Sequence, residues 1–408
     1  MVAHFFAWLM VFAIPWQDMI VLPGIGTVSK LLGVAALGAT VLQVLFTARV
    51  RKPVAFHWIL AVFLCWILLS TYWAIAQPES IERKVNTYLQ ILVMVWVIWE
   101  ASPTRSRLVS LLQAYVLGAY VAAGSTIYDY LTGSVMGQRD HGRFAATGFD
   151  ANDLGTLLAL ALPMAWYIAT ASPYPWQRAL NRAYFVIGAV SILLTGSRGA
   201  MITSIVALSV IPLTLKQMRT GIKVASIVMM ILAGIAAAWL VPTTSFERLS
   251  TTTTEISEGT LTGRIAIWKS GLRAVPGAPL QGYGPGGWFV AAGSVFGRIR
   301  SPHNTYLSIL VEQGMVGLLL FLSLFVVILA RLRHLPTFER RIGLVLLTTL
   351  AIAITPLGWD TTKALWLVLA LLVGWADVLG SSRPAAPRAR PVRTGLRRPP
   401  PPRPAAVQ

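Results

Sequence analysis

One histidine and a few arginines are the side chains of this sequence best suited to chemistry, and they lie in separate stretches. His303 stands in SPHN, directly before a long apolar run. Arg198 stands in TGSRGA, and Arg264 begins RIAIWKSGLRAV. A neutral imidazole can take a proton from an attacking hydroxyl, and guanidinium groups bind phosphate oxygens through paired N–H donors. Without a general acid, this set suits a diphosphate leaving group, which needs charge neutralisation and no proton.

The residues around His303 predict the start of a helix. Ser301 is a favourable N-cap and Pro302 suits the first helical position, which puts His303 in the first turn. The positive end of the helix should keep its imidazole neutral. Asn304 follows and is expected to support the site. Glu312, nine residues after His303, is an acid in an apolar helix; we expect it to face away from His303 and to pair with an arginine.

Arg264 belongs to the longest connection between apolar runs, residues 242–303. Loops of more than roughly 12–15 residues in compact proteins are usually functional. Thr262 is a predicted N-cap. Apolar residues then recur at helical spacing, at Ile265, Trp268, Leu272 and Val275, which predicts an amphipathic helix lying at the membrane surface. Residues 282–287, GYGPGG, predict a tight turn; the GK[ST] of a phosphate-binding P-loop is missing.

The connection 132–152 contributes Arg143, which we expect to bind the diphosphate together with Arg198 and Arg264. Its other charged residues are interpreted as a solvated loop with local ion pairs. Two acid-containing pairs are weak candidates for a metal site, His141 with Asp140 and Asp150 with Asp153. We expect a site without metal and without another cofactor. The outer connections also lack the paired carboxylates of a glycosidase.

Composition and patterning predict an all-α polytopic membrane protein. Of the 408 residues, 56% are hydrophobic and only 12% are charged, which excludes a water-soluble enzyme. Twelve apolar runs can cross a hydrocarbon layer of about 30 Å, near residues 3–22, 29–48, 54–76, 85–101, 108–131, 153–171, 180–197, 199–215, 222–241, 304–330, 342–359 and 362–379. They divide the chain into helices 1–9 (1–241), a large outer loop containing helices (242–303), helices 10–12 (304–380) and a disordered Pro- and Arg-rich tail (381–408).

The net charge of +19 reports topology. With the N-terminus inside, the even-numbered connections and the tail hold 21 of the 34 Lys and Arg residues. By the positive-inside rule these parts are cytoplasmic, as are both termini, and the loop 242–303 lies outside. The excess of base is therefore not a nucleic-acid footprint, and we expect no nucleic-acid partner.

Four stretches, in this order and on one side of the membrane, resemble the O-antigen ligase/polymerase superfamily. They are TGSRGA around Arg198, GR-x3-W at Gly263–Trp268, the turn at 282–287 and HNTYLSILVEQGMVGLLL from His303. The specific part of the resemblance runs from about residue 143 to 320. The length, twelve spans and single large loop look most like the O-antigen ligases.

This resemblance implies a metal-independent glycosyltransferase of GT-C-like fold that acts in lipopolysaccharide biosynthesis. It would transfer O-antigen polysaccharide from undecaprenyl diphosphate to a sugar hydroxyl of lipid A–core, with inversion, at the periplasmic face of the bacterial inner membrane. The implied partners are this donor, this acceptor and membrane lipids; the oligomeric state stays open. The implied roles are diphosphate binding for Arg198 and Arg264 and general base for His303. The family pattern also contains an acid at Glu312 and an arginine near Arg143.

Two other functions remain open. An O-antigen polymerase is the nearest, and it is described by two R-x10-G motifs in different outer loops. Arg248–Gly259 and Arg273–Gly284 fit that spacing, but both lie in one loop, and about two matches are expected by chance. A polysaccharide or lipid transporter is more remote, because the chain has no internal repeat and its unusual residues gather at one face.

Overall fold

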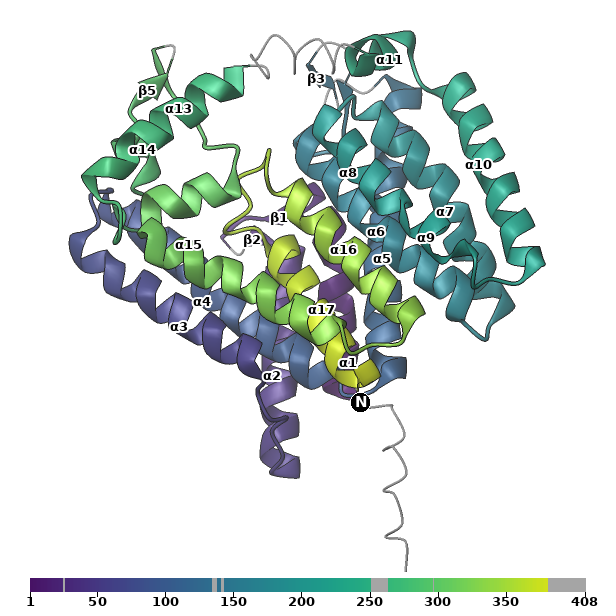
Figure 1. Ribbon diagram of the computed structural model, residues 1–408, viewed down its shortest axis with the longest axis horizontal. Coiled ribbons are helices and arrows are strands. Elements are labelled where there is room, and N and C mark those ends of the chain that lie inside the picture. The colour runs from purple at the N-terminus through teal and green to yellow at the C-terminus, as the bar shows by residue number, and fades with distance from the viewer. Residues whose placement is uncertain (25, 134–137, 141–142, 251–262, 296, 381–408) are drawn as a thin grey trace, which may run out of the picture.

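The structure is a computed structural model that describes residues 1–24, 26–133, 138–140, 143–250, 263–295 and 297–380. Within these residues each of the twelve apolar runs is helical (Figure 1). The helices that correspond to them are α1 (Val2–Ala13), α2 (Val28–Thr47), α3 (Ala55–Leu69), α4 (Pro78–Ala101), α5 (Arg105–Thr132), α6 (Ala151–Ala171), α7 (Pro175–Leu194), α8 (Arg198–Leu208) with α9 (Val210–Leu215), α10 (Thr220–Leu240), α15 (Thr305–Leu332), α16 (Thr337–Ala353) and α17 (Lys363–Gly380).

Eight helical segments of the described chain are long and apolar enough to cross a membrane: α2, α3 with its short extension η2 (Ser70–Trp73), α5, α6, α8 with α9, α10, α15 and α17. The other four helices are shorter or more polar. The helix α1 has 12 residues and continues as a 3-10 segment, η1 (Ile14–Met19), with Pro15 near its start. The helix α16 has 17 residues, and α4 and α7 begin with charged and polar residues. The all-α, polytopic membrane class is thus confirmed.

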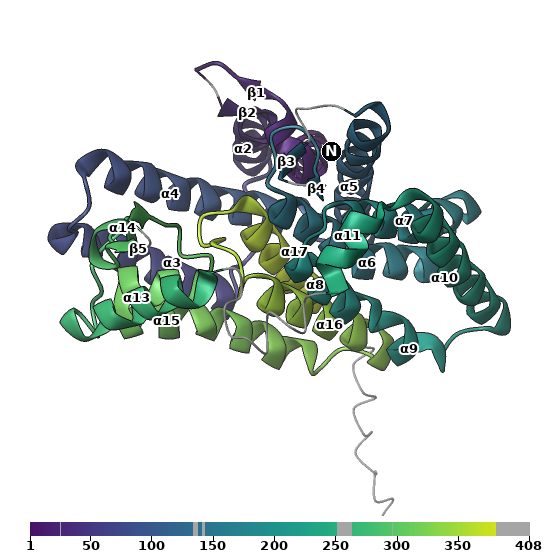
Figure 2. The ribbon, with the colours of Figure 1, turned by 90° about the horizontal axis from the view of Figure 1, so that it is seen from above.

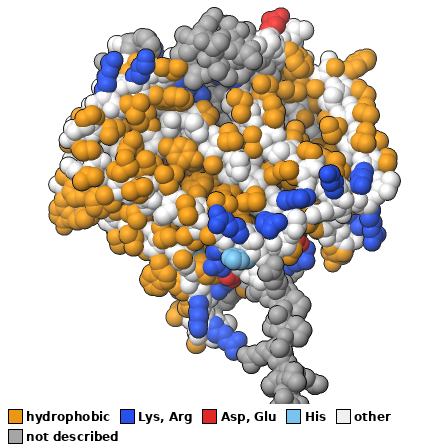
Figure 3. Space-filling view, viewed as in Figure 1, with side chains coloured by type: hydrophobic (Ala, Val, Ile, Leu, Met, Phe, Trp, Pro, Cys, Tyr) orange, Lys and Arg blue, Asp and Glu red, His pale blue; other side chains and the backbone are white. Residues whose placement is uncertain are grey.

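Hydrophobic side chains cover the middle of the visible face, while many of the Lys and Arg side chains lie toward the end that carries the N-terminus (Figure 3). This arrangement suits a protein whose waist contacts lipid hydrocarbon. At the opposite end, which we call the loop end, lie the segments between α10 and α15 (Figures 1 and 2). They comprise α11 (Thr243–Ser250), α13 (Arg264–Ala274), η4 (Val275–Gly277), α14 (Trp288–Ala291), β5 (Ser294–Val295) and β6 (Arg298–Ile299).

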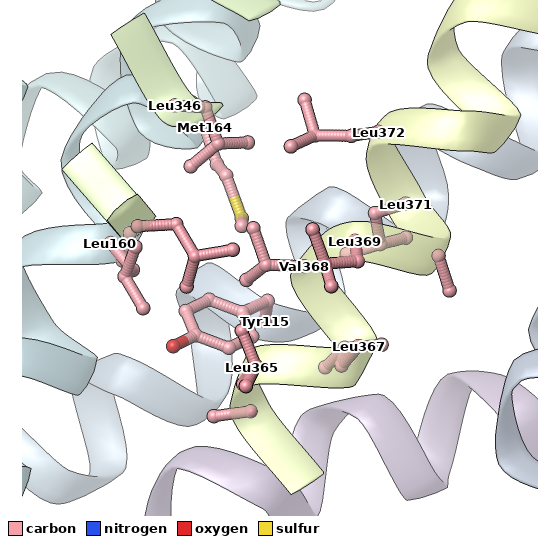
Figure 4. Close-up of a cluster of buried hydrophobic side chains, with 14 of the residues drawn as sticks. Tyr115, Leu160, Met164, Leu346, Leu365, Leu367, Val368, Leu369, Leu371 and Leu372 are labelled. Atoms are coloured by element: carbon pink, nitrogen blue, oxygen red, sulfur yellow. The ribbon is translucent and has the colours of Figure 1, made fainter. Parts of the chain in front are cut away.

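The core is built around α6 and α17, the two most enclosed of the eight spans. A helix that is apolar on all sides has to be surrounded by others. Figure 4 shows side chains of α17, including Leu365, Val368 and Leu372, beside Leu160 and Met164 of α6, with Tyr115 of α5 and Leu346 of α16 nearby. This packing fixes where α6 and α17 begin, and both beginnings contribute residues to the loop end.

Three two-stranded antiparallel hairpins complete the described chain: β1 (Val21–Leu22) with β2 (Gly26–Thr27), β3 (Gln138–Asp140) with β4 (Arg143–Phe144), and β5 with β6. The second hairpin places Arg143 in the chain just before α6, and the third lies just before the segment that holds His303.

Candidate active site

His303 lies outside α15, so the expected position in the first helical turn was wrong. The helix begins at Thr305, and its N-cap is Asn304, whose side-chain oxygen accepts a hydrogen bond of 3.0 Å from the Leu307 N–H. His303 has a φ of +43°, in the left-handed region, and cannot continue a right-handed helix. Asn304 is therefore the N-cap of α15, the role that Ser301 was expected to have. Its supporting role is a structural one: it fixes where the helix starts beside His303.

Two tryptophans hold the chain that leads to His303. The Trp268 indole donates a hydrogen bond of 3.2 Å to the carbonyl oxygen of Pro302, and the Trp288 indole donates one of 2.9 Å to that of Arg300. Trp268 belongs to α13 and Trp288 to α14. The residues before His303 are thereby tied to the same helix that begins with Arg264.

The helix α13 packs against α15, where we had expected a helix lying at the membrane surface. Its buried positions are Ile267 and Gly271, not the predicted stripe, and Leu272 is 55% exposed. A Cβ on Gly271 would lie 2.5 Å from the Trp288 ring, so only glycine permits this close contact. The N-cap is Gly263, with a φ of +79°; the expected cap, Thr262, lies outside the described residues.

Arg264 and His303 are electrostatic neighbours. Burial lowers the pKa of the His303 imidazole below its ordinary value, and the positive charge of Arg264 lowers it further; Asp150 acts in the opposite direction. Burial also lowers the pKa of Arg264, against the attraction of Asp150 and Asp153. The sequence predicted a neutral imidazole because of the positive end of the helix. In the structure the causes of the lowered pKa are burial and the charge of Arg264.

Arg198 and Arg143 meet at a neighbouring turn. Arg198 is the first residue of α8, and the hydroxyl of its N-cap, Ser197, accepts a hydrogen bond of 3.2 Å from the Ala200 N–H. Arg143 is buried and donates from Nε to the Thr195 carbonyl oxygen at 3.0 Å. A second guanidinium nitrogen of Arg143 donates to the Asn152 side-chain oxygen at 2.9 Å, and the Ser197 hydroxyl donates to that same oxygen at 2.9 Å. Arg143 therefore orders the turn from which Arg198 projects.

The contacts of Asn152 and Asp153 correct their interpretation as part of a solvated loop, whereas Asp150 is exposed as expected. Asp150 is the N-cap of α6, and its side chain accepts from the Asn152 N–H at 2.8 Å. Asp153 accepts a hydrogen bond of 2.8 Å from the indole N–H of Trp359. Among the described residues, no group of three or more His, Cys, Asp or Glu is arranged to hold a metal ion. His141 of the other weak metal candidate lies outside that part of the chain.

The connection between α16 and α17, residues 354–362, joins the separate pieces of the site. Thr305, at the start of α15, donates through its N–H to the Ile354 carbonyl oxygen at 3.1 Å and through its hydroxyl to that of Leu357 at 2.7 Å. Trp359 reaches Asp153 on α6. A Cβ on Gly199, next to Arg198, would lie 3.4 Å from Pro356. One connection thus contacts the beginnings of α6, α8 and α15.

Glu312 pairs with a lysine, where we had expected an arginine. Its Oε2 lies 2.5 Å from Lys84 Nζ, and the same ammonium lies 2.7 Å from Asp360. Glu312 also accepts a hydrogen bond of 3.1 Å from the Gly286 N–H, in the glycine-rich turn. That turn is as tight as predicted: a Cβ on Gly282 would lie 2.4 Å from the Gly314 nitrogen. Both carboxylates are almost fully buried, and sequence reasoning missed Lys84 and Asp360.

This ionic cluster lines a cavity of ≈ 270 Å³. Its walls include Lys84, Glu312 and Asp360 together with Ser301 and Pro302, the two residues before His303. The loop end therefore contains two adjoining groups: Arg264 and His303 with Asp150 and Asp153, and the Lys84 cluster. The first can remove a proton and neutralise an anion; the second fixes the glycine-rich turn and the connection 354–362 relative to α15.

A match to a known protein family covers part of the site. Residues 183–322 match the model of a family described as O-antigen ligase. No curated protein matches the chain. The matched region covers about a third of the chain and contains Arg198, Arg264, His303 and Glu312, whereas Arg143 and Lys84 precede it.

Proposed function

We propose that this chain, which matches the O-antigen ligase family model over residues 183–322, is an O-antigen ligase. It transfers O-antigen polysaccharide from undecaprenyl diphosphate to a sugar hydroxyl of lipid A–core, with inversion and without a metal ion. The observation that carries this proposal is the partly buried imidazole of His303 within electrostatic reach of Arg264, at the loop end of a membrane-spanning bundle, with the two segments tied by the hydrogen bond from Trp268 to Pro302.

In the proposed reaction His303 is the base. Its unprotonated ring nitrogen takes the proton of the acceptor hydroxyl while that oxygen attacks the anomeric carbon of the donor sugar. The bond from this carbon to the diphosphate oxygen breaks, and the diphosphate leaves with the electron pair. Because a diphosphate anion is a good leaving group, its departure requires positive charge in place of a proton. His303 later releases its proton to solvent.

The arginines divide the neutralisation of that charge. Arg264 and Arg198 bind the diphosphate oxygens directly, with guanidinium forks that match two oxygens at once. Arg143 adds positive charge. It holds the turn at Thr195–Ser197 directly, by a hydrogen bond to the Thr195 carbonyl oxygen, and through Asn152, whose side-chain oxygen accepts from both Arg143 and Ser197. Glu312 acts at a distance: it holds the glycine-rich turn against α15 by accepting from the Gly286 N–H, and its ion pair with Lys84 ties α15 to α4.

The proposed location is the bacterial inner membrane, with the loop end in the periplasm and both termini in the cytoplasm. The charge distribution supports this orientation, since the even-numbered connections and the tail together hold 21 of the 34 Lys and Arg residues of the sequence, and many of the visible Lys and Arg side chains lie toward the end opposite the loop end. A lipid-linked donor and a lipid acceptor would then both reach His303 from the outer leaflet.

A deletion strain tests the function through its lipopolysaccharide. If the chain is a ligase, unsubstituted lipid A–core accumulates together with long lipid-linked O-antigen, and the full-length gene restores attachment. Lipid A–core carrying only one repeat unit would identify a polymerase. Unchanged lipopolysaccharide would contradict both. Reversible loss of transfer on EDTA treatment of the purified protein would contradict the metal-independent mechanism.

A further inference from the structure

A second cavity, of ≈ 420 Å³, lies between α2 and α4, apart from the candidate active site. Its volume falls within the roughly 300–1,000 Å³ of ordinary ligand sites. Most of its lining is aliphatic, with Val34 and Leu37 on α2 and Met94 and Val97 on α4. We call this cavity the α2–α4 groove. Val34 is 64% exposed, so the groove is open on the side that the bundle turns toward lipid.

The α2–α4 groove has a polar end and an apolar end. Lys30 is the third residue of α2, and Lys363 is the first residue of α17. Both lysines line the groove, and so do Asn86 and Thr87 in the first half of α4. Lys363 donates a hydrogen bond of 2.8 Å to Ser29, which brings the starts of α17 and α2 together. Leu37, Met94 and Val97 come later in their helices, deeper in the bundle.

The polar end carries positive charge that no ion pair balances within the described residues. The ammonium of Lys363 donates to three neutral oxygens, those of Ser29, Thr27 and Gln17, which uses its three N–H donors. Within the described residues neither Lys30 nor Lys363 forms an ion pair, although Asp18 acts on Lys363 from further away. Lys30 is exposed, so its ammonium can reach a ligand, while Lys363 supplies a fixed charge beside it.

We propose that the α2–α4 groove binds an anionic phospholipid, with one acyl chain between α2 and α4 and the phosphate at Lys30. A single apolar slot open to the side accepts a hydrocarbon chain from the surrounding leaflet. Two adjacent ammonium groups at the membrane boundary attract a phosphate headgroup. This inference does not depend on the proposed glycosyl transfer, because none of the residues of the first group at the loop end lines the groove.

A second copy of the chain is a poorer occupant on electrostatic grounds. Two identical chains associate most often through a two-fold axis, which brings the same surface of each chain together. The exposed Lys30 of each copy would then add positive charge to the same interface. A phospholipid brings the opposite charge and an apolar chain in one molecule.

Lipid binding by the purified full-length protein tests the proposal. The protein in detergent is titrated with phosphatidylglycerol, or with phosphatidylcholine of the same acyl chains, and the bound lipids are counted by native mass spectrometry. We expect phosphatidylglycerol to bind preferentially. Lys30→Gln should weaken its binding about five-fold, as expected for one basic residue at a membrane surface, and should reduce the preference accordingly. Lys52→Gln, an exposed lysine beyond the other end of α2, is the charge control.

A second pair of variants tests the apolar slot without a change in charge. Val34→Trp should fill the groove and abolish the saturable phosphatidylglycerol adduct, while Leu45→Trp, on the same helix but outside the groove, should leave it intact. Equal binding of the two lipids by the unmodified protein would overturn the proposal. So would an adduct that survives both Lys30→Gln and Val34→Trp, or a dimer that Val34→Trp dissociates and that carries no lipid.

Discussion

Trp268, one helical turn after Arg264, donates its indole N–H to the carbonyl oxygen of Pro302, the residue before His303, over 3.2 Å. The segments of the proposed phosphate-binding arginine and of the proposed base are thereby tied together, although the two residues are 39 positions apart in the chain. Catalytic groups need this kind of support, because small displacements of reacting atoms greatly reduce rates.

Trp268→Phe removes this hydrogen bond and keeps the aromatic ring. We expect the turnover number to fall several-fold, in line with the roughly 1 kcal/mol of one hydrogen bond, while the protein stays folded. Transfer of lipid-linked O-antigen to lipid A–core by the purified protein measures the effect. Trp239→Phe, an 86% exposed tryptophan on α10, is the control. Equal activity of the two variants would show that the Trp268 bond does not position His303.

His303→Ala removes the proposed base. Loss of a general base reduces rates by about 10²–10⁴-fold, so attachment of O-antigen should become undetectable while lipid-linked polymer accumulates. The membrane content of the protein, followed by immunoblot, should remain normal, because His303 lies outside α15. Attachment at the normal level would remove His303 from the mechanism.

The pH dependence of transfer should reflect the lowered pKa of His303. The neutral ring is the active form, so activity is complete above the folded-state pKa and declines as the pH falls through it, below the ordinary value of about 6.5. Arg264→Gln removes a positive neighbour and therefore raises the pKa of His303. The acid limb of the rate profile should move to higher pH in this variant, whatever its maximal rate. An unchanged limb would mean that Arg264 does not act on His303.

Arg264→Lys keeps the charge but loses the two-pronged guanidinium. Because a lysine contacts phosphate as a point charge, we expect at least about a ten-fold decrease in kcat/KM for the lipid-linked donor, equivalent to roughly 1.4 kcal/mol. Arg273→Lys, an exposed arginine at the other end of α13, provides the matched comparison. Full activity of Arg264→Lys would argue against bidentate binding.

Lys84→Met tests the ionic cluster as a stabilising element. The substitution leaves Glu312 and Asp360 buried without their shared cation, which typically costs about 3–5 kcal/mol. The thermal midpoint of the purified protein should fall well below that of Arg83→Gln, an exposed neighbour. Adding Glu312→Gln to Lys84→Met should recover part of the loss, because one buried charge is then gone. Identical midpoints for the two single variants would exclude this role.

The helices could be predicted from the sequence, but the local placement of the candidate site residues was only partly right. Apolar runs predict each spanning helix because, in hydrocarbon, the backbone N–H and C=O groups can form hydrogen bonds only with one another. The position of the α15 cap was wrong, since Ser301-Pro302 and Asn304 are both good start signals and only the left-handed backbone at His303 selects the second. The prediction of the buried face of α13 was also wrong, because the Trp288 ring packs against the side of that helix that carries Gly271.

The sequence by itself determined the membrane class, the charge asymmetry and which residues are candidates for the site. Those properties follow from composition and from short-range periodicity. Only the tertiary structure decided which partners meet: Lys84 with Glu312 across 228 positions, and Trp359 with Asp153 across 206. Pairings of this length depend on how the helices pack around α6 and α17, and a single sequence carries no local signal for them. The physical reason is that burial forces each charged or polar group to find a partner, whereas its position in the chain does not specify which one.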